Sequence, residues 1–270
     1  PNAITTTTGE IVCAYYTRDT SRTDEYGIEV SIRSTAGTWS TVLISSTAND
    51  VPSLQVQSPA LMLLPSGRVL CYYWIFDTSN NEANIRSYYS DDDGVSWALG
   101  EPAVLDSAIT YSTTEGAGTA GYACRRIRAA YSAGTICLVV QVRRASTTAN
   151  ARDTFQQWAS ADLGSRFTSV EEWGDTSGLG GDWHDVLPVQ GGFLFVWLDL
   201  SAKDPLSKRI GNAYSKLTAA TSQATMTSSV DMAEIDGSGK FFLDGDCASC
   251  VDATGNVYVY PRATAVGGME

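Results

Sequence analysis

The sequence predicts an all-β protein, a β-propeller built of four-stranded blades. The first observation is a hairpin pattern that recurs about every 60 residues along the chain. The second is that helical periodicity is nearly absent, whereas Thr, Ser, Val and Tyr, which strands favour, are abundant. A hairpin repeating at this period has to bury its faces against its neighbours, and the radial stacking of a propeller achieves that.

The repeated hairpin begins with a glycine and continues as an apolar strand. Its five copies read "GEIVCAYY" from Gly9, "GRVLCYYW" from Gly67, "GTICLVVQV" from Gly134, "GFLFVWL" from Gly192 and "GNVYVY" from Gly255. Apolar residues at successive positions predict strands that are buried on both faces. Because glycine adopts positive φ easily, we expect each of these glycines in a tight turn between two strands.

The copies divide the chain into five repeats of one domain, a single propeller over residues 1–270. The approximate limits of the repeats are 1–50, 55–108, 120–175, 183–230 and 240–270. The first four have room for a complete four-stranded blade, and the last has room for its first hairpin. The chain therefore covers four to five blades.

The charge and the hydropathy of the chain argue against two classes of partner, nucleic acids and membranes. The 270 residues carry a formal net charge of −12, with a sequence pI of about 4.5. A surface this acidic repels phosphate backbones and anionic lipid, so we expect no nucleic-acid binding. No apolar run approaches the roughly 18 residues of a membrane span, so we expect no membrane insertion.

Metal and redox chemistry receive little support from the histidine and cysteine content. His184 is the single histidine, which excludes multi-histidine metal sites, and we interpret it as structural. Cys247 and Cys250 form "CASC", but no second such pair completes a zinc ribbon. A disulfide or redox role for this pair stays open beside its interpretation as small buried residues. We expect no metal and no cofactor.

A second motif lies downstream of the glycine turns of the second and third repeats. It reads "SDDDGVSW" and "SADLGSRF", or S-x-D-x-G-x-x-(W/F). Its defining residues are Ser90, Asp92, Gly94, Trp97, Ser160, Asp162, Gly164 and Phe167. Short polar side chains accept hydrogen bonds from the backbone of their own turn, and the aromatic ring covers apolar surface. We therefore interpret both aspartates as structural.

A calcium loop is the alternative for the acidic stretch, and it fails on spacing. An EF-hand loop needs a glutamate at its twelfth position. Counted from Asp91, that position is Pro102. The first repeat holds a degraded copy of the turn motif, "SIRSTAGTWS", which keeps Gly37 and Trp39 but lacks the aspartate.

The S-x-D-x-G-x-x-(W/F) pattern resembles the Asp box, or BNR repeat, of the sialidase-like β-propellers. The resemblance implies about six blades in the complete propeller, so we expect this sequence to be a fragment of a longer chain. It also implies that the motif turns lie on the rim, away from a ligand cleft at the other end. The family includes exo-sialidases, other glycosidases and propellers that only bind glycans, so fold alone does not settle function.

The resemblance also indicates which residues to test for catalysis. Catalytic sialidases carry an arginine in an R-I-P-x-L strand, which pairs with the sugar carboxylate. The best match here, "VQSPALMLL", has Gln57 at the arginine position, which argues against catalysis. In "CRRIRAAYSAG", Arg126 or Arg128 could bind an acid sugar, and Asp153 could be the acid. The alternative is that these arginines form surface or inter-blade ion pairs.

Sugar binding without catalysis needs aromatic faces and polar side chains in a concave site. Trp74, Trp173 and Trp183 are the candidate binding residues, although each also suits core or inter-blade packing. Polar segments such as "DTSNNEAN" and "RASTTANARD" are typical of recognition loops.

We expect the protein to recognise a cell-surface or polysaccharide glycan without catalysis, as an adhesion-type module outside a cell or on a virion such as a phage tail or fibre. Glycoside hydrolysis of the exo-sialidase type is the first alternative. A structural propeller that contacts other chains of a larger assembly is the second.

Overall fold

The computed structural model describes strands and their turns over most of the chain. The described residues are 2–18, 26–46, 54–77, 82–100, 111–112, 124–144, 152–164, 167–173, 181–189, 192–199, 209–218, 221–225, 241–252, 254 and 256–265. They contain strands throughout and no helix that is long and apolar enough to cross a membrane. The all-β prediction is confirmed.

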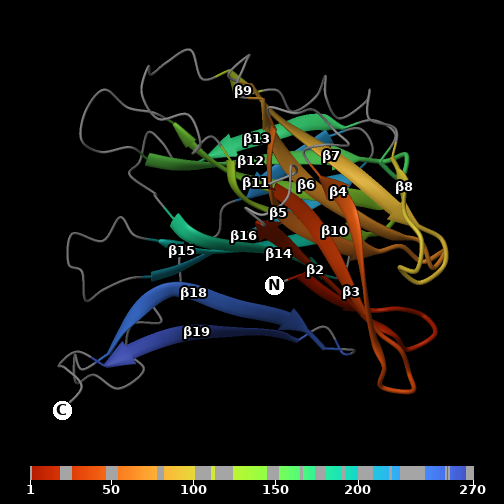
Figure 1. The fold of residues 1–270 in the computed structure, drawn as a ribbon. Coiled ribbons are helices and arrows are strands. Elements are labelled where there is room, and N and C mark those ends of the chain that lie inside the picture. Colours follow the sequence, from red (N-terminus) through yellow and green to blue (C-terminus); the bar gives the residue numbers. More distant parts are fainter. Residues whose placement is uncertain are drawn as a thin grey trace.

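The strands form five successive antiparallel sheets, named blades 1 to 5 (Figure 1). Blade 1 contains β1 (Asn2–Thr5), β2 (Ile11–Arg18), β3 (Tyr26–Arg33) and β4 (Trp39–Ser46). Blade 2 contains β5 (Leu54–Leu63), β6 (Val69–Asp77), β7 (Glu82–Ser90) and β8 (Ala98–Leu99), and β9 (Tyr111–Ser112) also pairs with β7. In each sheet the strands follow one another in chain order, except that β9 pairs with β7 rather than with β8.

The later blades repeat this arrangement. Blade 3 contains β10 (Cys124–Ser132), β11 (Thr135–Arg144), β12 (Arg152–Ser160) and β13 (Thr168–Trp173). Blade 4 contains β14 (Gly181–Val189), β15 (Gly192–Asp199), β16 (Arg209–Thr218) and β17 (Thr221–Thr225). Blade 5 is the hairpin of β18 (Phe241–Val251) and β19 (Val257–Ala265).

The first strands of the blades lie next to one another. β5 contacts β10, β10 contacts β14, and β14 contacts β18. These first strands are the innermost strands of a radial stack, and the later strands of each blade lie further out (Figure 1). The observed four-stranded, radially arranged sheets agree with the predicted propeller architecture.

Apolar side chains fill the spaces between blades. One cluster joins blades 1 and 2 and includes Val12, Ile28 and Tyr73. A second joins blades 2 and 3 through residues such as Tyr72 and Leu138. A third joins blades 3 and 4. β6 and β11, the second strands of blades 2 and 3, therefore bury both faces, as their continuous apolar runs predict. The prediction is wrong for β2 of blade 1, where Val12 and Ala14 are buried but Tyr15 on the other face is 39% exposed.

The repeated glycines differ in their positions. Gly9, Gly67 and Gly134 lie in turns with φ between 86° and 93°, as expected. Gly192 does not lie in the turn, because it is the first residue of β15 and pairs with Val189. Gly255 lies outside the described residues. The expectation that Gly192 itself lies in the turn is therefore wrong, because β15 begins at this glycine, whereas β11 begins one residue after Gly134.

The CASC pair lies in a single extended strand. Cys247 pairs with Pro261 and Cys250 with Tyr258, so both cysteines belong to the regular part of β18. Three steps along a strand separate Cα atoms by about 10 Å, and a disulfide requires less than about 7 Å. This extended backbone excludes a disulfide between the two cysteines.

Candidate functional site

Because neighbouring strands in each blade are antiparallel, the connections between strands lie alternately at the two ends of the stack. The connections between the first and second strands, and between the third and fourth, share one end, which we call the turn end. In blade 2 the turn end carries both Gly67 and the stretch from Asp91 to Trp97. The second and third strands of each blade connect at the opposite end, as do successive blades.

Asp92 binds its own turn at the turn end. Its Oδ1 accepts hydrogen bonds from the backbone N–H of Ser96 at 2.8 Å and from the Ser90 hydroxyl at 2.8 Å. Its Oδ2 accepts one from the Ser96 hydroxyl at 2.5 Å. Hydrogen bonds from the Ser96 hydroxyl and N–H hold the pKa of Asp92 below its usual value. This carboxylate is an acceptor within a structural turn.

The glycine and the tryptophan complete this turn. The Ser90 Oγ also accepts a hydrogen bond from the Gly94 N–H at 2.8 Å, and Gly94 has φ of 94°. The Trp97 Nε1–H donates to the Gly94 carbonyl at 2.7 Å, and its ring packs against the cluster between blades 1 and 2. Trp39, in the degraded copy, is instead 54% exposed at the start of β4.

The second motif forms a similar turn in blade 3. Ser160 donates to the Oδ1 of Asp162 at 2.7 Å and accepts from the Gly164 N–H at 2.8 Å. Phe167 is buried and meets the Tyr72 ring of blade 2 edge-on, with centroids 6.0 Å apart. Each motif turn thus packs its aromatic residue against the preceding blade.

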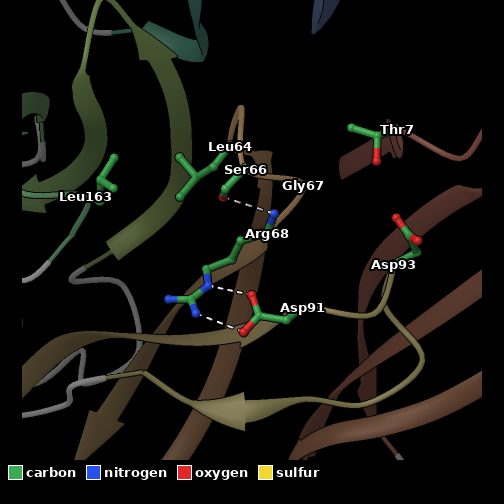
Figure 2. A pocket seen from close by; sticks show the side chains of 8 residues that line it. All are labelled: Thr7, Leu64, Ser66, Gly67, Arg68, Asp91, Asp93 and Leu163. Carbon is green, nitrogen blue, oxygen red and sulfur yellow. Dashed lines mark hydrogen bonds and ion pairs between the residues drawn. The ribbon is translucent and has the colours of Figure 1, made fainter.

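A hollow of about 430 Å³ also lies at the turn end (Figure 2). Arg68 forms a two-point ion pair with Asp91, with Nε–Oδ1 at 2.7 Å and Nη2–Oδ2 at 2.8 Å. The Arg68 guanidinium also lies 4.3 Å from the centroid of the Tyr89 ring. Both ion-pair partners are well exposed, so this pair joins two turns of blade 2 on the surface.

A polar cluster lies on the inner strands of blades 3, 4 and 5. Arg128 of β10 faces Asp185 of β14, with Nε and Oδ1 3.6 Å apart. Ser249 of β18 donates its hydroxyl to the Asp185 Oδ2 at 2.6 Å. The side chains of Arg128 and Asp185 are 14% and 21% exposed, so the pair is largely buried but still reachable from solvent. We call these three residues the inner-strand cluster.

Further hydrogen bonds fix both charged members of the cluster. The Arg128 Nη1 donates to the Ile127 carbonyl at 2.9 Å, and the Val186 N–H donates to the Asp185 Oδ1 at 2.9 Å. Burial raises the pKa of Asp185, whereas Arg128 and Ser249 lower it. Burial lowers the pKa of Arg128, Asp185 raises it, and the nearby Arg126 lowers it. The arginine nevertheless stays charged at neutral pH.

The predicted catalytic residues lie at different depths of blade 3. Arg126 and Arg128 lie two positions apart on the innermost strand, so they share one face of β10. Asp153 lies on β12, two strands further out, where it pairs with Arg143 of β11. Its side chain lies outside the described part of the structure. The described geometry therefore brings Arg128 to Asp185 of the neighbouring blade, an inter-blade ion pair.

The predicted binding tryptophans lie on three different strands. Trp74 is on β6, Trp173 is the last residue of β13, and Trp183 is on β14 beside a register shift. Gln57 is on β5 and pairs with Trp74. The side chains of these tryptophans lie outside the described part, so their use in sugar binding stays a prediction.

Sequence reasoning missed Asp185 and Ser249. Asp185 follows His184 within an apolar strand, and Ser249 is the serine inside CASC. A charged residue directly before the buried residues Val186 and Leu187 is a signal, because a buried charge requires a partner. The partner itself comes from a distant blade. The described residues contain no group of three or more His, Cys, Asp or Glu side chains arranged to hold a metal.

Comparison with known proteins gives fold relatives only. No protein-family model and no curated protein matches the sequence. Among solved structures, the polysaccharide lyase Uly1 is similar over 99% of this chain and 55% of its own, with 11% identity and a TM-score of 0.59. This chain thus spans about half the length of that lyase.

Two further structures extend the comparison. A protein of unknown function from Dyadobacter fermentans matches 98% of this chain and 77% of its own, with 18% identity and a TM-score of 0.63. The α-L-arabinanase of Cellvibrio cellulosa, solved with arabinohexaose, matches 83% of this chain and 76% of its own, with 10% identity and a TM-score of 0.54. At these identities the likeness shows that the chain has the β-propeller fold.

Proposed function

We propose that this protein recognises carbohydrate at the inner-strand cluster and does not hydrolyse it. The observation that carries the proposal is the convergence of Arg128, Asp185 and Ser249 from the inner strands of three successive blades. Polar groups from separate rigid elements, partly open to solvent, can fix the hydroxyl groups of a sugar. The proposed partner is a cell-surface or polysaccharide glycan.

The fold relatives support a glycan as the ligand. One of them is named as a polysaccharide lyase, and another was solved with a bound arabinohexaose. The same fold hosts unrelated activities, so this support is by analogy.

The state of Arg128 supports binding without sialidase-type catalysis. A sialidase-type site needs arginines available to pair with the sugar carboxylate. Here Asp185 already faces the Arg128 Nε, and Gln57 stands where the sialidase pattern has its arginine. These two features favour recognition over turnover of an acidic sugar.

We further propose that the two serine–aspartate turns are Asp boxes of the sialidase-like type. The turn hydrogen bonds of Asp92 and Asp162 and the inward-packed rings of Trp97 and Phe167 support this assignment. We propose an extracellular or virion-surface location, which the sialidase-like pattern and the glycan partner favour.

The test is glycan-array binding together with turnover assays on fluorogenic sialosides and arabinofuranosides. We expect binding without turnover, and we expect Arg128→Gln to weaken binding at least tenfold. Arg68→Gln is the matched control, because it removes a guanidinium at the turn end, and it should leave binding unchanged. Absence of binding to any glycan, or equal effects of the two substitutions, would contradict the proposal.

Glycoside hydrolysis is the second candidate, and Asp185 is the observation that favours it. A partly buried carboxyl with a raised pKa beside an arginine is the kind of group that hydrolases use as an acid. Hydrolysis also requires a second carboxyl about 5 to 10 Å away. Turnover in the fluorogenic assays that Asp185→Asn abolishes would establish this candidate in place of the first.

A further inference from the structure

We propose that Asp185 determines the charge of the accepted glycan by occupying Arg128, so that the site takes neutral sugars in preference to acidic ones. This inference rests on the proposed function and names its ligand class. It differs from the expectation that these arginines bind an acid sugar. The residues that carry it are Arg128, Asp185 and Ser249.

The Arg128 guanidinium is already engaged at its Nη1 and at its Nε. Its Nη1 donates to the Ile127 carbonyl at 2.9 Å. Its Nε faces the Asp185 Oδ1 at 3.6 Å. A guanidinium pairs most strongly with a carboxylate through two adjacent N–H groups. A sugar carboxylate would have to displace Asp185 to reach the Nε edge of Arg128.

Asp185 is held in this position from two sides. The Val186 N–H donates to its Oδ1 at 2.9 Å, and the Ser249 hydroxyl donates to its Oδ2 at 2.6 Å. Both oxygens therefore act as acceptors, which is the role of an ionised carboxylate. Because Ser249 belongs to blade 5 and Arg128 to blade 3, docking of three blades fixes the ion pair.

Displacing Asp185 would be unfavourable for the folded protein. The carboxylate is about four-fifths buried, and a buried charge that loses its partner is strongly destabilising. An incoming acidic sugar would also lie close to the Asp185 charge, within a chain of net charge −12. A neutral sugar meets neither obstacle, because its hydroxyl groups can bond to the exposed parts of both side chains.

Removing only the charge of Asp185 should reverse this preference. Arg126 lies two positions before Arg128 on the same face of β10 and is close enough to lower its pKa. In Asp185→Asn, the guanidinium groups of Arg126 and Arg128 would therefore remain near one another, and the negative charge that faces Arg128 from β14 would be gone. Such a pair attracts an anionic ligand.

The experiment compares binding of arabinohexaose and of tri-galacturonate by calorimetry, at low and at physiological salt. For the unaltered protein we expect the acidic sugar to bind at least tenfold more weakly than the neutral one. For Asp185→Asn we expect at least a tenfold gain for tri-galacturonate that salt reduces, and less than a threefold change for arabinohexaose. Asp91→Asn is the matched control: it makes the same change in net charge at the turn end and should leave both affinities unchanged.

Ser249→Ala provides a second test that keeps the carboxylate. It removes the hydrogen bond that Ser249 donates to Asp185, and it should raise the affinity for tri-galacturonate by less than Asp185→Asn does. Ser249→Thr keeps the hydroxyl and should restore the original ratio of the affinities for arabinohexaose and tri-galacturonate. If Asp185→Asn does not fold, the Ser249 pair of variants decides.

The outcomes separate the two proposals. If the unaltered protein binds neither sugar but Asp185→Asn acquires salt-sensitive binding of tri-galacturonate, the role of Asp185 stands and the proposed natural function falls. If the unaltered protein binds tri-galacturonate as tightly as Asp185→Asn does, or if no variant changes the ratio, Asp185 does not set ligand charge and the inference is overturned.

Discussion

At the scale of single residues, the glycines of the two motif turns are contact points between blades. A Cβ on Gly94 would lie 3.2 Å from the Cγ2 of Val12 in blade 1. A Cβ on Gly164 would lie 3.1 Å from the Tyr72 hydroxyl oxygen in blade 2. Both glycines also have positive φ, at 94° and 97°. Glycine is required at these positions for backbone conformation and for packing against the preceding blade.

Gly94→Ala should therefore destabilise the protein more than the same substitution at a glycine that has a similar φ but no close neighbour. Gly134 is that control, because its φ is 86° and, among the described residues beyond its chain neighbours, no atom lies within 4 Å of an added Cβ. We expect Gly134→Ala to cost about 1–2 kcal/mol from backbone strain alone. Gly94→Ala should cost about 1–3 kcal/mol more, because an added methyl over-packs a filled contact. Urea unfolding of both variants measures the difference, and equal losses would show that the contact with Val12 contributes nothing.

At the scale of structural elements, the turn after β7 depends on an ionised carboxylate. The hydrogen bonds to Asp92 lower its pKa in the folded state. A lowered pKa means that the stabilising contribution is fully present above the ordinary carboxyl pKa of about 4. That contribution is lost as the pH falls through the folded-state value. Asp185 gives the opposite dependence of stability on pH. Burial raises its pKa, so protonation of Asp185 favours the folded state.

Asp92→Asn should consequently lower the melting temperature at pH 7 and have little effect near pH 2. Asparagine cannot accept on both terminal atoms, so it loses one of the bonds that Ser96 donates to the carboxylate. Thermal melts of the two proteins across this pH range give the measurement. Curves that stay the same distance apart at every pH would show that the charge on Asp92 does not matter. Asp93→Asn, on the next residue of the turn, is the control for a change of net charge.

At the scale of the whole molecule, the blades are joined by apolar clusters that share strands. Cys71 of β6 belongs to the cluster between blades 1 and 2, and Cys137 of β11 belongs to the cluster between blades 3 and 4. The cluster between blades 2 and 3 connects these strands through Tyr72 and Leu138. Blades 1 to 4 should therefore unfold as one unit rather than one at a time.

Thiol labelling in urea tests this cooperativity. Cys71 and Cys137 are fully buried, and burial raises the pKa of both thiols, so neither should react in the native protein. The exposed Cys250 should react at once and serves as the internal control. We expect Cys71 and Cys137 to become reactive at the same urea concentration. Peptide mass spectrometry measures the labelling of each cysteine. Separate midpoints would show that the blades unfold independently.

Much of the fold could be predicted because its determinants are local. The glycine hairpins, the double-sided apolar strands and the serine–aspartate turns each depend on residues close together in the sequence. The exception at Gly192 is instructive. Its strand was identified correctly, but β15 begins at Gly192 itself, whereas β11 begins one residue after Gly134. Apolar pattern alone does not fix the residue at which a strand begins.

The sequence by itself determined the repeated blade, its strand order and the residues that stabilise its turns, because neighbours along the chain make those contacts. Only the tertiary structure decided the partner of Arg128, since Asp185 and Ser249 reach it from two other blades. It also showed that the CASC pair is held apart by the extended β18. The physical reason is that charge compensation depends on distances across the stack, and those distances exist only after the blades have docked.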